Sequence, residues 1–227
     1  MKIINTFSDQ VTIAISDLSD GNMRTFDADD ESKIIENQLK FCQILNVIPE
    51  HSLRQRITYE SRNSFTEYLE ITPENLDSFC ITNAAKDIPI CDGFVTSLSQ
   101  INLILPLADC LGIVIVDEKR HLLGLLHSGR QNLEQFGSQK FVEFFQEKFG
   151  SNPAELKVFL SPCARNYQIY ALDNQKLPDA AKSQLAAAGI LPENITDSAI
   201  DTVTDPNYPS HSSGDKKLRF AIAAKLN

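Results

Sequence analysis

The sequence predicts an α+β protein in which mixed β-sheets are layered with helices, in a single domain spanning residues 1–227. Many short strand-like runs are interspersed with a few helical segments, and the two do not alternate regularly as they do in βαβ folds. The 227 residues are 42% hydrophobic, which is enough for one sizeable core. No internal repeat, low-complexity tract or linker divides the chain.

The amino-terminal elements are predicted from periodicity and acidic residues. Residues 1–27 alternate loosely between apolar and polar side chains, which predicts one or two short strands, with residues 12–15 the best candidate. The acidic run at residues 27–32 is typical of a helix start, because carboxylates are favoured near the positive end of the helix dipole. Apolar side chains then recur at helical spacing over residues 34–46, and Pro49 closes this helix.

The next segments favour strands. Residues 56–60 and 65–71 are rich in β-branched and aromatic residues. Pro73 and the residues after it predict a loop. Within residues 80–100, the stretch from Asp92 to Thr96 predicts a strand or a turn.

Residues 101–127 predict a buried strand followed by a tight hairpin. The runs are apolar on both faces, which is typical of central, covered strands. A turn centred between Glu118 and Lys119 would make Cys110 and His127 cross-strand partners, with Cβ atoms about 4.5–5.5 Å apart.

The carboxy-terminal part predicts two helices and three strands. Aromatic and aliphatic residues at helical spacing predict a helix over residues 132–149, and a flanking proline and glycine predict another over residues 179–188. Residues 156–160 form a short apolar run, and residues 199–204 and 218–226 are predicted to be the two final strands.

Charge and cysteine usage exclude several classes of protein. The formal charge is −9 and the pI is near 4.9, so neither nucleic acid nor an anionic membrane surface is expected as a partner. The five cysteines are odd in number and lack a Cys-x-x-Cys motif, which favours free thiols in the cytoplasm over a disulfide framework. Asp9 interrupts the first apolar run too early for a signal peptide, and no apolar stretch reaches membrane-spanning length.

The pairing of a thiol with an imidazole makes Cys110 and His127 the main candidates for chemistry. Such a pair is the start of either a cysteine nucleophile or a zinc site. Asp109 has two interpretations: it orients an imidazole, or it caps the corner before the hairpin. Arg130 follows a glycine turn that bares backbone N–H groups, which suggests an anion cradle.

Two more basic residues are candidates from distant parts of the chain. Arg165 follows a strand and is either an anion ligand or an exposed loop cation. His211 lies in a polar loop that could reach the site. His51 and His121 are expected to be solvated. The sequence has no glycine-rich nucleotide motif, P-loop, nucleophile elbow or His-Glu-x-x-His, which excludes the common classes that carry them.

Three short motifs together resemble the laccase-like polyphenol oxidase family, which is also called peptidoglycan editing factor and includes purine nucleoside phosphorylases. They are Cys91-Asp92-Gly93-Phe94-Val95-Thr96, Ala108-Asp109-Cys110 and His127-Ser128-Gly129. Softer matches extend the resemblance over roughly residues 25–227; they include Ser161-Pro162 through Tyr167, Asp201-Thr202-Val203-Thr204, Ser210-His211 and Arg219.

The resemblance implies a zinc held by Cys110, His127 and a further histidine. In this chain Thr58 stands where that histidine is expected, and a neutral hydroxyl is a poor zinc ligand. The family's Trp-Arg pair is also altered, although Arg130 would fill the arginine role if one residue were deleted. Copper is not expected, because the chain lacks the clustered histidines of a multicopper site.

Three hypotheses follow for the function. The first is a purine nucleoside phosphorylase-like enzyme acting on adenosine- or inosine-type nucleosides, with phosphate against Arg130, Arg165 or His211 and with Thr58 facing the substrate. Cys110 and His127 would then hold a zinc or polarise the sugar or base. The second is a metal-free cysteine hydrolase or amidase acting, for example, on an amino-sugar substrate, and the third is a catalytically degenerate binding protein.

Overall fold

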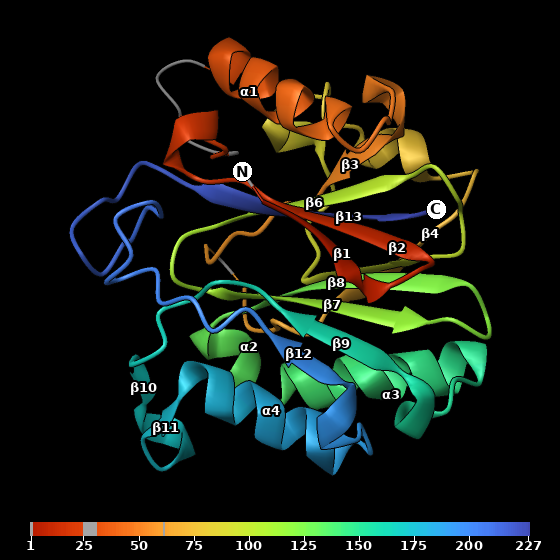
Figure 1. Cartoon of the computed structure of the whole chain (residues 1–227), viewed down its shortest axis with the longest axis vertical. Helices are drawn as coiled ribbons and strands as arrows, with labels where there is room; N and C mark the ends of the chain where they lie inside the picture. The colour runs from red at the N-terminus through yellow and green to blue at the C-terminus, as the bar shows by residue number, and fades with distance from the viewer. Residues whose placement is uncertain (1, 25–30, 61) are drawn as a thin grey trace.

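Two β-sheets pack face to face, and helices cover both outer faces (Figure 1). The computed structural model describes residues 2–24, 31–60 and 62–227. This arrangement confirms the predicted α+β class with mixed sheets. In the described part of the chain, no helix is both long enough and apolar enough to cross a membrane.

The first sheet has the strand order β1-β2-β13-β6-β3. Its β3–β6 pair is parallel, and the other neighbouring pairs are antiparallel. Helix α1 lies over its outer face (Figure 1). The bounds are β1 Lys2–Ser8, β2 Val11–Ile15, β3 Ser52–Arg54, β6 Asn102–Leu107, β13 Phe220–Leu226 and α1 Glu31–Gln43.

The second sheet has the strand order β12-β9-β7-β8-β5-β4. Its two outermost pairs are parallel, and its central pairs are antiparallel. Helices α2, α3 and α4 cover its outer face (Figure 1). The bounds are β4 Tyr68–Ile71, β5 Gly93–Thr96, β7 Leu111–Asp117, β8 Leu122–Ser128, β9 Lys157–Leu160, β12 Ile195–Asp197, α2 Arg130–Glu134, α3 Gly137–Phe149 and α4 Leu177–Ala187.

A small hairpin and several 3₁₀ helices complete the described structure. The hairpin consists of β10 Gln168–Ile169 and β11 Gln175–Lys176. The 3₁₀ helices are Leu18–Asp20, Pro49–His51, Leu76–Phe79, Ala85–Asp87, Pro153–Glu155, Tyr170–Leu172 and Pro192–Asn194.

Strand alternation explains why the central strands are apolar on both faces. Leu103 and Leu105 of β6 enter the core between the two sheets, whereas Ile104 packs beneath α1. In the same way, Val114 of β7 faces the other sheet and Ile113 faces the helices of the opposite layer. Each central strand therefore contributes to two cores at once.

The helix predicted over residues 132–149 is two helices, α2 and α3, because the chain leaves the helical conformation at Phe136. Phe136 adopts a left-handed conformation with φ of 60°, which interrupts the hydrogen-bond ladder. Gly137 packs against Asn132 so closely that a Cβ would lie 2.1 Å from the Asn132 side chain. The helix predicted over residues 179–188 is confirmed as α4, which starts two residues earlier.

Other predictions need correction or fall partly outside the described residues. Residues 56–60 are not a strand: Arg56 makes only an isolated bridge with Ile90, and residues 57–60 line a pocket. Residues 199–204 form turns rather than a strand, since Asp201 alone pairs with Cys163. Most of the acidic run at 27–32 lies outside the described residues, and α1 ends at Gln43 rather than Asn46.

The hairpin is present, but its predicted register is wrong by two positions. His127 pairs with Gly112, and Cys110 precedes β7. The Asp117 carboxylate accepts hydrogen bonds from the backbone N–H groups of Lys119 and Arg120, at 3.0 Å each. These bonds fold a four-residue turn and shift its centre toward the carboxy terminus.

Candidate functional site

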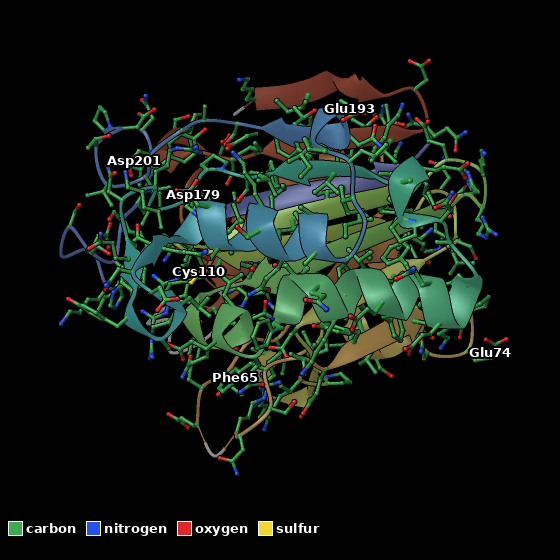
Figure 2. The ribbon with its side chains drawn as sticks, turned by 90° about the horizontal axis from the view of Figure 1, so that it is seen from below. Phe65, Glu74, Cys110, Asp179, Glu193 and Asp201 are labelled. Carbon is green, nitrogen blue, oxygen red and sulfur yellow. The ribbon has the colours of Figure 1, made fainter. Side chains whose placement is uncertain are left out.

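A pocket of about 670 Å³ opens where β6 ends, β7 begins and β8 ends. Its walls come from the loop before β4, the β6–β7 connection, the end of β8 with the start of α2, and the polar loop before β13. Figure 2 shows Cys110 beside the amino-terminal end of α4, whose first residue, Leu177, also lines the pocket. The pocket size is typical of small-molecule sites.

Cys110 and His127 both line this pocket, although they are not cross-strand partners. Gly129 lies against both of them. A Cβ on Gly129 would lie 3.0 Å from Cys110 Sγ and 3.1 Å from His127 Cε1. The missing side chain of Gly129 therefore makes room for the thiol and the imidazole.

Tyr59 is the third member of this cluster. Its hydroxyl lies 3.5 Å from His127 Nε2 and 4.0 Å from Cys110 Sγ. Its ring meets the imidazole nearly edge-on, and it also packs on Phe65, with ring centroids 6.3 and 5.8 Å away. Sequence reasoning missed Tyr59. The available signal was its position directly after Thr58, where a ligand is expected.

Burial keeps the groups of the cluster neutral at pH 7. Burial lowers the pKa of His127 to about 4, an effect that Asp92 opposes and Arg62 reinforces. Burial also raises the pKa of the Cys110 thiol and that of the Tyr59 hydroxyl above their ordinary values. The site therefore contains a thiol, a phenol and a neutral imidazole rather than a thiolate–imidazolium pair.

A buried ion pair supports His127 and the Tyr59 loop from behind. The fully buried Asp92 carboxylate accepts two hydrogen bonds from the Arg62 guanidinium, at 3.2 and 2.6 Å, and a third from Glu67 N at 3.0 Å. The Asp92 carbonyl accepts a hydrogen bond from His127 N at 2.8 Å. Asp92 thus joins the loop that carries Tyr59 to the end of β8.

Asp109 anchors the polar loop before β13. Its carboxylate accepts hydrogen bonds from Thr202 Oγ1 at 2.8 Å and from Ser212 N at 2.6 Å. Its carbonyl accepts a hydrogen bond from Ala164 N at 2.8 Å. Of the two interpretations of Asp109, this geometry corresponds to fixing a corner, and the corner holds His211 at the pocket wall.

Basic side chains gather on the pocket wall of this acidic chain. Arg24, Arg130, Arg219 and His211 all line the pocket. Arg24 Nη1 and Arg219 Nη1 both donate to the carbonyl of Lys216, at 3.3 Å each, so the two guanidinium groups lie close together. Burial lowers the pKa of Arg219, and the nearby charge of Arg24 lowers it further. Such a pair favours an anion between them.

Of the other residues predicted to belong to the site, two line the pocket and one does not. Thr58 lines the pocket. Arg130 lines it too, and forms an ion pair with Glu134 at 3.2 Å. Arg165 does not line the pocket; its guanidinium donates two hydrogen bonds to Asp197, at 2.8 and 3.0 Å.

The donor set of the cluster does not fit a catalytic zinc, which usually has three protein ligands. Within the described ranges, no three His, Cys, Asp or Glu residues are placed to hold one metal ion together. Cys110 and His127 are two good donors, but the Tyr59 hydroxyl beside them is a poor zinc ligand compared with an imidazole or a thiolate. The carboxylate of the neighbouring Asp109 is already occupied by hydrogen bonds.

Comparisons with known proteins place this geometry in context. A family model described as "Multi-copper polyphenol oxidoreductase laccase" matches residues 10–175. A purine nucleoside phosphorylase from Borreliella burgdorferi is 33% identical over 75 residues, which are 33% of this chain and 32% of that protein. The match thus spans about a third of that relative's length.

Solved structures share the fold along almost the whole chain. The hypothetical protein YfiH from Bacillus licheniformis has a TM-score of 0.85 at 20% identity, covering 99% of this chain and 96% of that one. YlmD from Geobacillus stearothermophilus has a TM-score of 0.80 at 17% identity, covering 96% and 91%. At this level of identity, the likeness concerns the fold.

Proposed function

Because this chain belongs to the multi-copper polyphenol oxidoreductase laccase family, and part of it resembles a purine nucleoside phosphorylase, we propose that it cleaves purine nucleosides with phosphate. The observation that carries the proposal is one pocket that combines an arginine pair with a neutral Tyr59–His127–Cys110 cluster. Adenosine and inosine are the substrates of this class.

Arg24 and Arg219 form the phosphate subsite in this proposal. Both guanidinium groups donate to the carbonyl of Lys216 and line a partly enclosed pocket, where a phosphate between them would reduce their mutual repulsion. His211 stands on the same wall and adds a hydrogen-bond donor. Arg24 and Arg219 take the phosphate-binding role that the sequence suggested for Arg165, because the charge of Arg165 is already paired with Asp197.

The nucleoside occupies the remainder of the pocket. Ile57, Leu107 and Leu177 give this part apolar walls, and Tyr167 adds an aromatic face on which a purine can stack. Thr58 contributes a hydroxyl that can hydrogen-bond to the ribose.

The reaction exchanges one bond for another. An oxygen of hydrogen phosphate forms a bond to C1′ of the ribose while the C1′–N9 bond breaks. The electron pair of the C1′–N9 bond passes to the purine, which takes up the proton that the phosphate loses. The products are the free base and ribose 1-phosphate. The arginines hold the attacking anion, and the protonated hydroxyl of Tyr59, supported by His127, is placed to donate a hydrogen bond to the leaving base.

The electrostatics of the site favour this reaction over a cysteine hydrolase. A nucleophilic cysteine needs a cation that lowers its pKa, but His127 is neutral at pH 7 and the pKa of Cys110 is raised. Iodoacetamide labelling at pH 7 is therefore expected to be slow at Cys110.

The test is phosphate-dependent base release. Purified protein is incubated with inosine or adenosine, with and without orthophosphate, and the base and ribose 1-phosphate are quantified by chromatography. We expect release only with phosphate, and about a tenfold or greater rise in the KM for phosphate in Arg219→Gln. An absence of base release, with Cys110→Ala behaving like wild type, would end the proposal. Nucleoside binding without turnover would instead indicate a binding protein.

A further inference from the structure

We infer that Tyr59 stands in for the third metal ligand of this site, so that Tyr59, His127 and Cys110 act as a metal-free hydrogen-bonded cluster. In this cluster the Tyr59 hydroxyl, rather than a metal ion, contacts and polarises the ligand. The inference about the cluster is independent of the substrate; only its catalytic consequence rests on the proposed phosphorolysis.

The first argument is the position of the hydroxyl. Tyr59 Oη lies within reach of both atoms that would bind a metal, 3.5 Å from His127 Nε2 and 4.0 Å from Cys110 Sγ. The Tyr59 hydroxyl therefore takes the place of a third group beside the two donors. With His127 in the Nε2–H tautomer, the hydroxyl accepts from the imidazole and keeps its own O–H to donate to a ligand.

The second argument is that this position is held firmly. The Tyr59 ring packs on Phe65 and meets His127 nearly edge-on. The loop that carries Tyr59 is fixed by the Arg62–Asp92 ion pair, whose partners are 8% and 0% exposed. It is also tied to α2, because Asn132 Nδ2 donates to the carbonyl of Phe65 at 2.6 Å. The hydroxyl is therefore preorganised rather than a mobile surface group.

The third argument is the lack of a competing ligand. Among residues 2–24, 31–60 and 62–227, no group of three metal-binding side chains is assembled. The nearest carboxylate, Asp109, is committed to Thr202 and Ser212. Two donors alone make a weak zinc site, and a neutral hydroxyl adds little to them.

The cluster also faces the pocket. Tyr59 is 50% exposed, whereas His127 is 6% exposed behind it. The Tyr59 side chain as a whole is therefore more accessible than the imidazole, and both line the pocket. This arrangement lets Tyr59 contact the ligand directly and makes His127 the residue that positions the hydroxyl.

The primary test measures metal content. The full-length protein is incubated with excess zinc, desalted and analysed by mass spectrometry for bound metal. We expect fewer than about 0.1 zinc ions per chain, because two donors do not hold the ion through desalting. One zinc ion per chain that is lost in Cys110→Ala or His127→Ala would overturn the inference.

A second measurement detects the hydrogen bond itself. The ¹⁵N resonances of the His127 ring report the state of Nε2. Tyr59→Phe keeps the ring packing and removes only the hydroxyl, so we expect these resonances to move while the melting temperature stays nearly constant. Tyr170→Phe, at a site 86% exposed, is the matched control and should leave them unchanged. Identical His127 resonances in wild type and Tyr59→Phe would refute the inference.

The catalytic consequence is tested separately. If phosphorolysis is found, Tyr59→Phe should lower kcat by about 100-fold in metal-free protein, the usual size of a lost proton donor. Activity that appears only after zinc is added would contradict the inference. If no activity is found, the proposed function fails, while the zinc and resonance measurements still decide the state of the cluster.

Discussion

The site depends on single residues whose roles are steric as well as chemical. Gly129 gives space to Cys110 and His127, and its φ of −95° places no strain on a larger residue. The consequence of substituting Gly129 is therefore a displacement of the two functional side chains rather than a backbone penalty.

Gly129→Ala is predicted to weaken nucleoside binding by about tenfold or more, because the new methyl group must displace Cys110 Sγ or His127 Cε1. Calorimetric titration measures the affinity. Gly189→Ala is the control: it has a φ of +96° beyond the carboxy-terminal end of α4, so it should cost about 1 kcal/mol of stability without affecting binding. Equal affinity for wild type and Gly129→Ala would show that the close packing is unimportant.

Asp109→Asn is predicted to destabilise the protein by about 1–2 kcal/mol, because one carboxylate oxygen that accepts from Thr202 or Ser212 becomes an N–H donor. Asparagine tolerates the left-handed backbone at this position, where φ is 73°, so the substitution tests the hydrogen bonds alone. Urea denaturation measures the change. A difference below about 0.3 kcal/mol would argue against the anchoring role.

Some residues of the site can be predicted from the sequence, and others cannot. Cys110, His127, Thr58, Arg130 and His211 were predicted from the sequence and all line the pocket. Tyr59 was missed although it directly follows Thr58, because its place in the sequence does not show which side chains its hydroxyl contacts. Arg24 and Arg219 were also missed as a pair, since they lie at opposite ends of the chain and meet only in the folded protein.

At the scale of elements, side-chain ion pairs hold the edge strand β12 in place. Asp197, its last residue, pairs with Arg165 at 2.8 Å and with Lys182 of α4 at 2.6 Å. Burial alone would raise the pKa of Asp197, but hydrogen bonds from Arg165 and Lys182 outweigh it and lower the pKa to about 2.

Asp197→Asn is predicted to cost about 1–2 kcal/mol at pH 7. The folded-state pKa is below the unfolded value, so this stabilisation is present above pH 4 and is lost as the pH falls toward 2. Urea denaturation of both proteins between pH 2 and 7 measures the difference, which should converge to zero at the acid end. A difference that stays constant with pH would exclude the ion pairs as its cause.

The elements with regular apolar periodicity are the ones that the sequence predicts well. The final strand, β13, and helix α4 lie where the pattern placed them. The predicted strand at residues 56–60 is a pocket wall, because a β-rich composition does not supply a strand partner. The helix break at Phe136 could not be predicted, since the helical spacing of apolar residues continues across the left-handed residue between α2 and α3.

At the scale of the whole molecule, the pocket forms only when both sheets are packed. Its walls combine the end of β6 in the first sheet with the start of β7 and the end of β8 in the second (Figure 1). The strand that completes the first sheet, β13, comes last in the chain and inserts between β2 and β6. The site is therefore assembled by long-range contacts.

Ile222→Ala is predicted to lower the free energy of unfolding by about 2–4 kcal/mol, because Ile222 is fully buried in the core between the sheets. The pocket and the core both depend on the packing of the two sheets. Nucleoside binding and the circular dichroism signal of the folded protein should therefore disappear in one transition as urea is added. Separate transitions would show that the site survives without the packed sheets.

The most direct test of the account is the activity of protein freed of metal. The protein is treated with a chelator, its zinc content is verified, and the release of hypoxanthine from inosine is followed with and without phosphate. The account predicts base release that requires phosphate and is unchanged by added zinc. Release that depends on zinc, or no release under either condition, would contradict it.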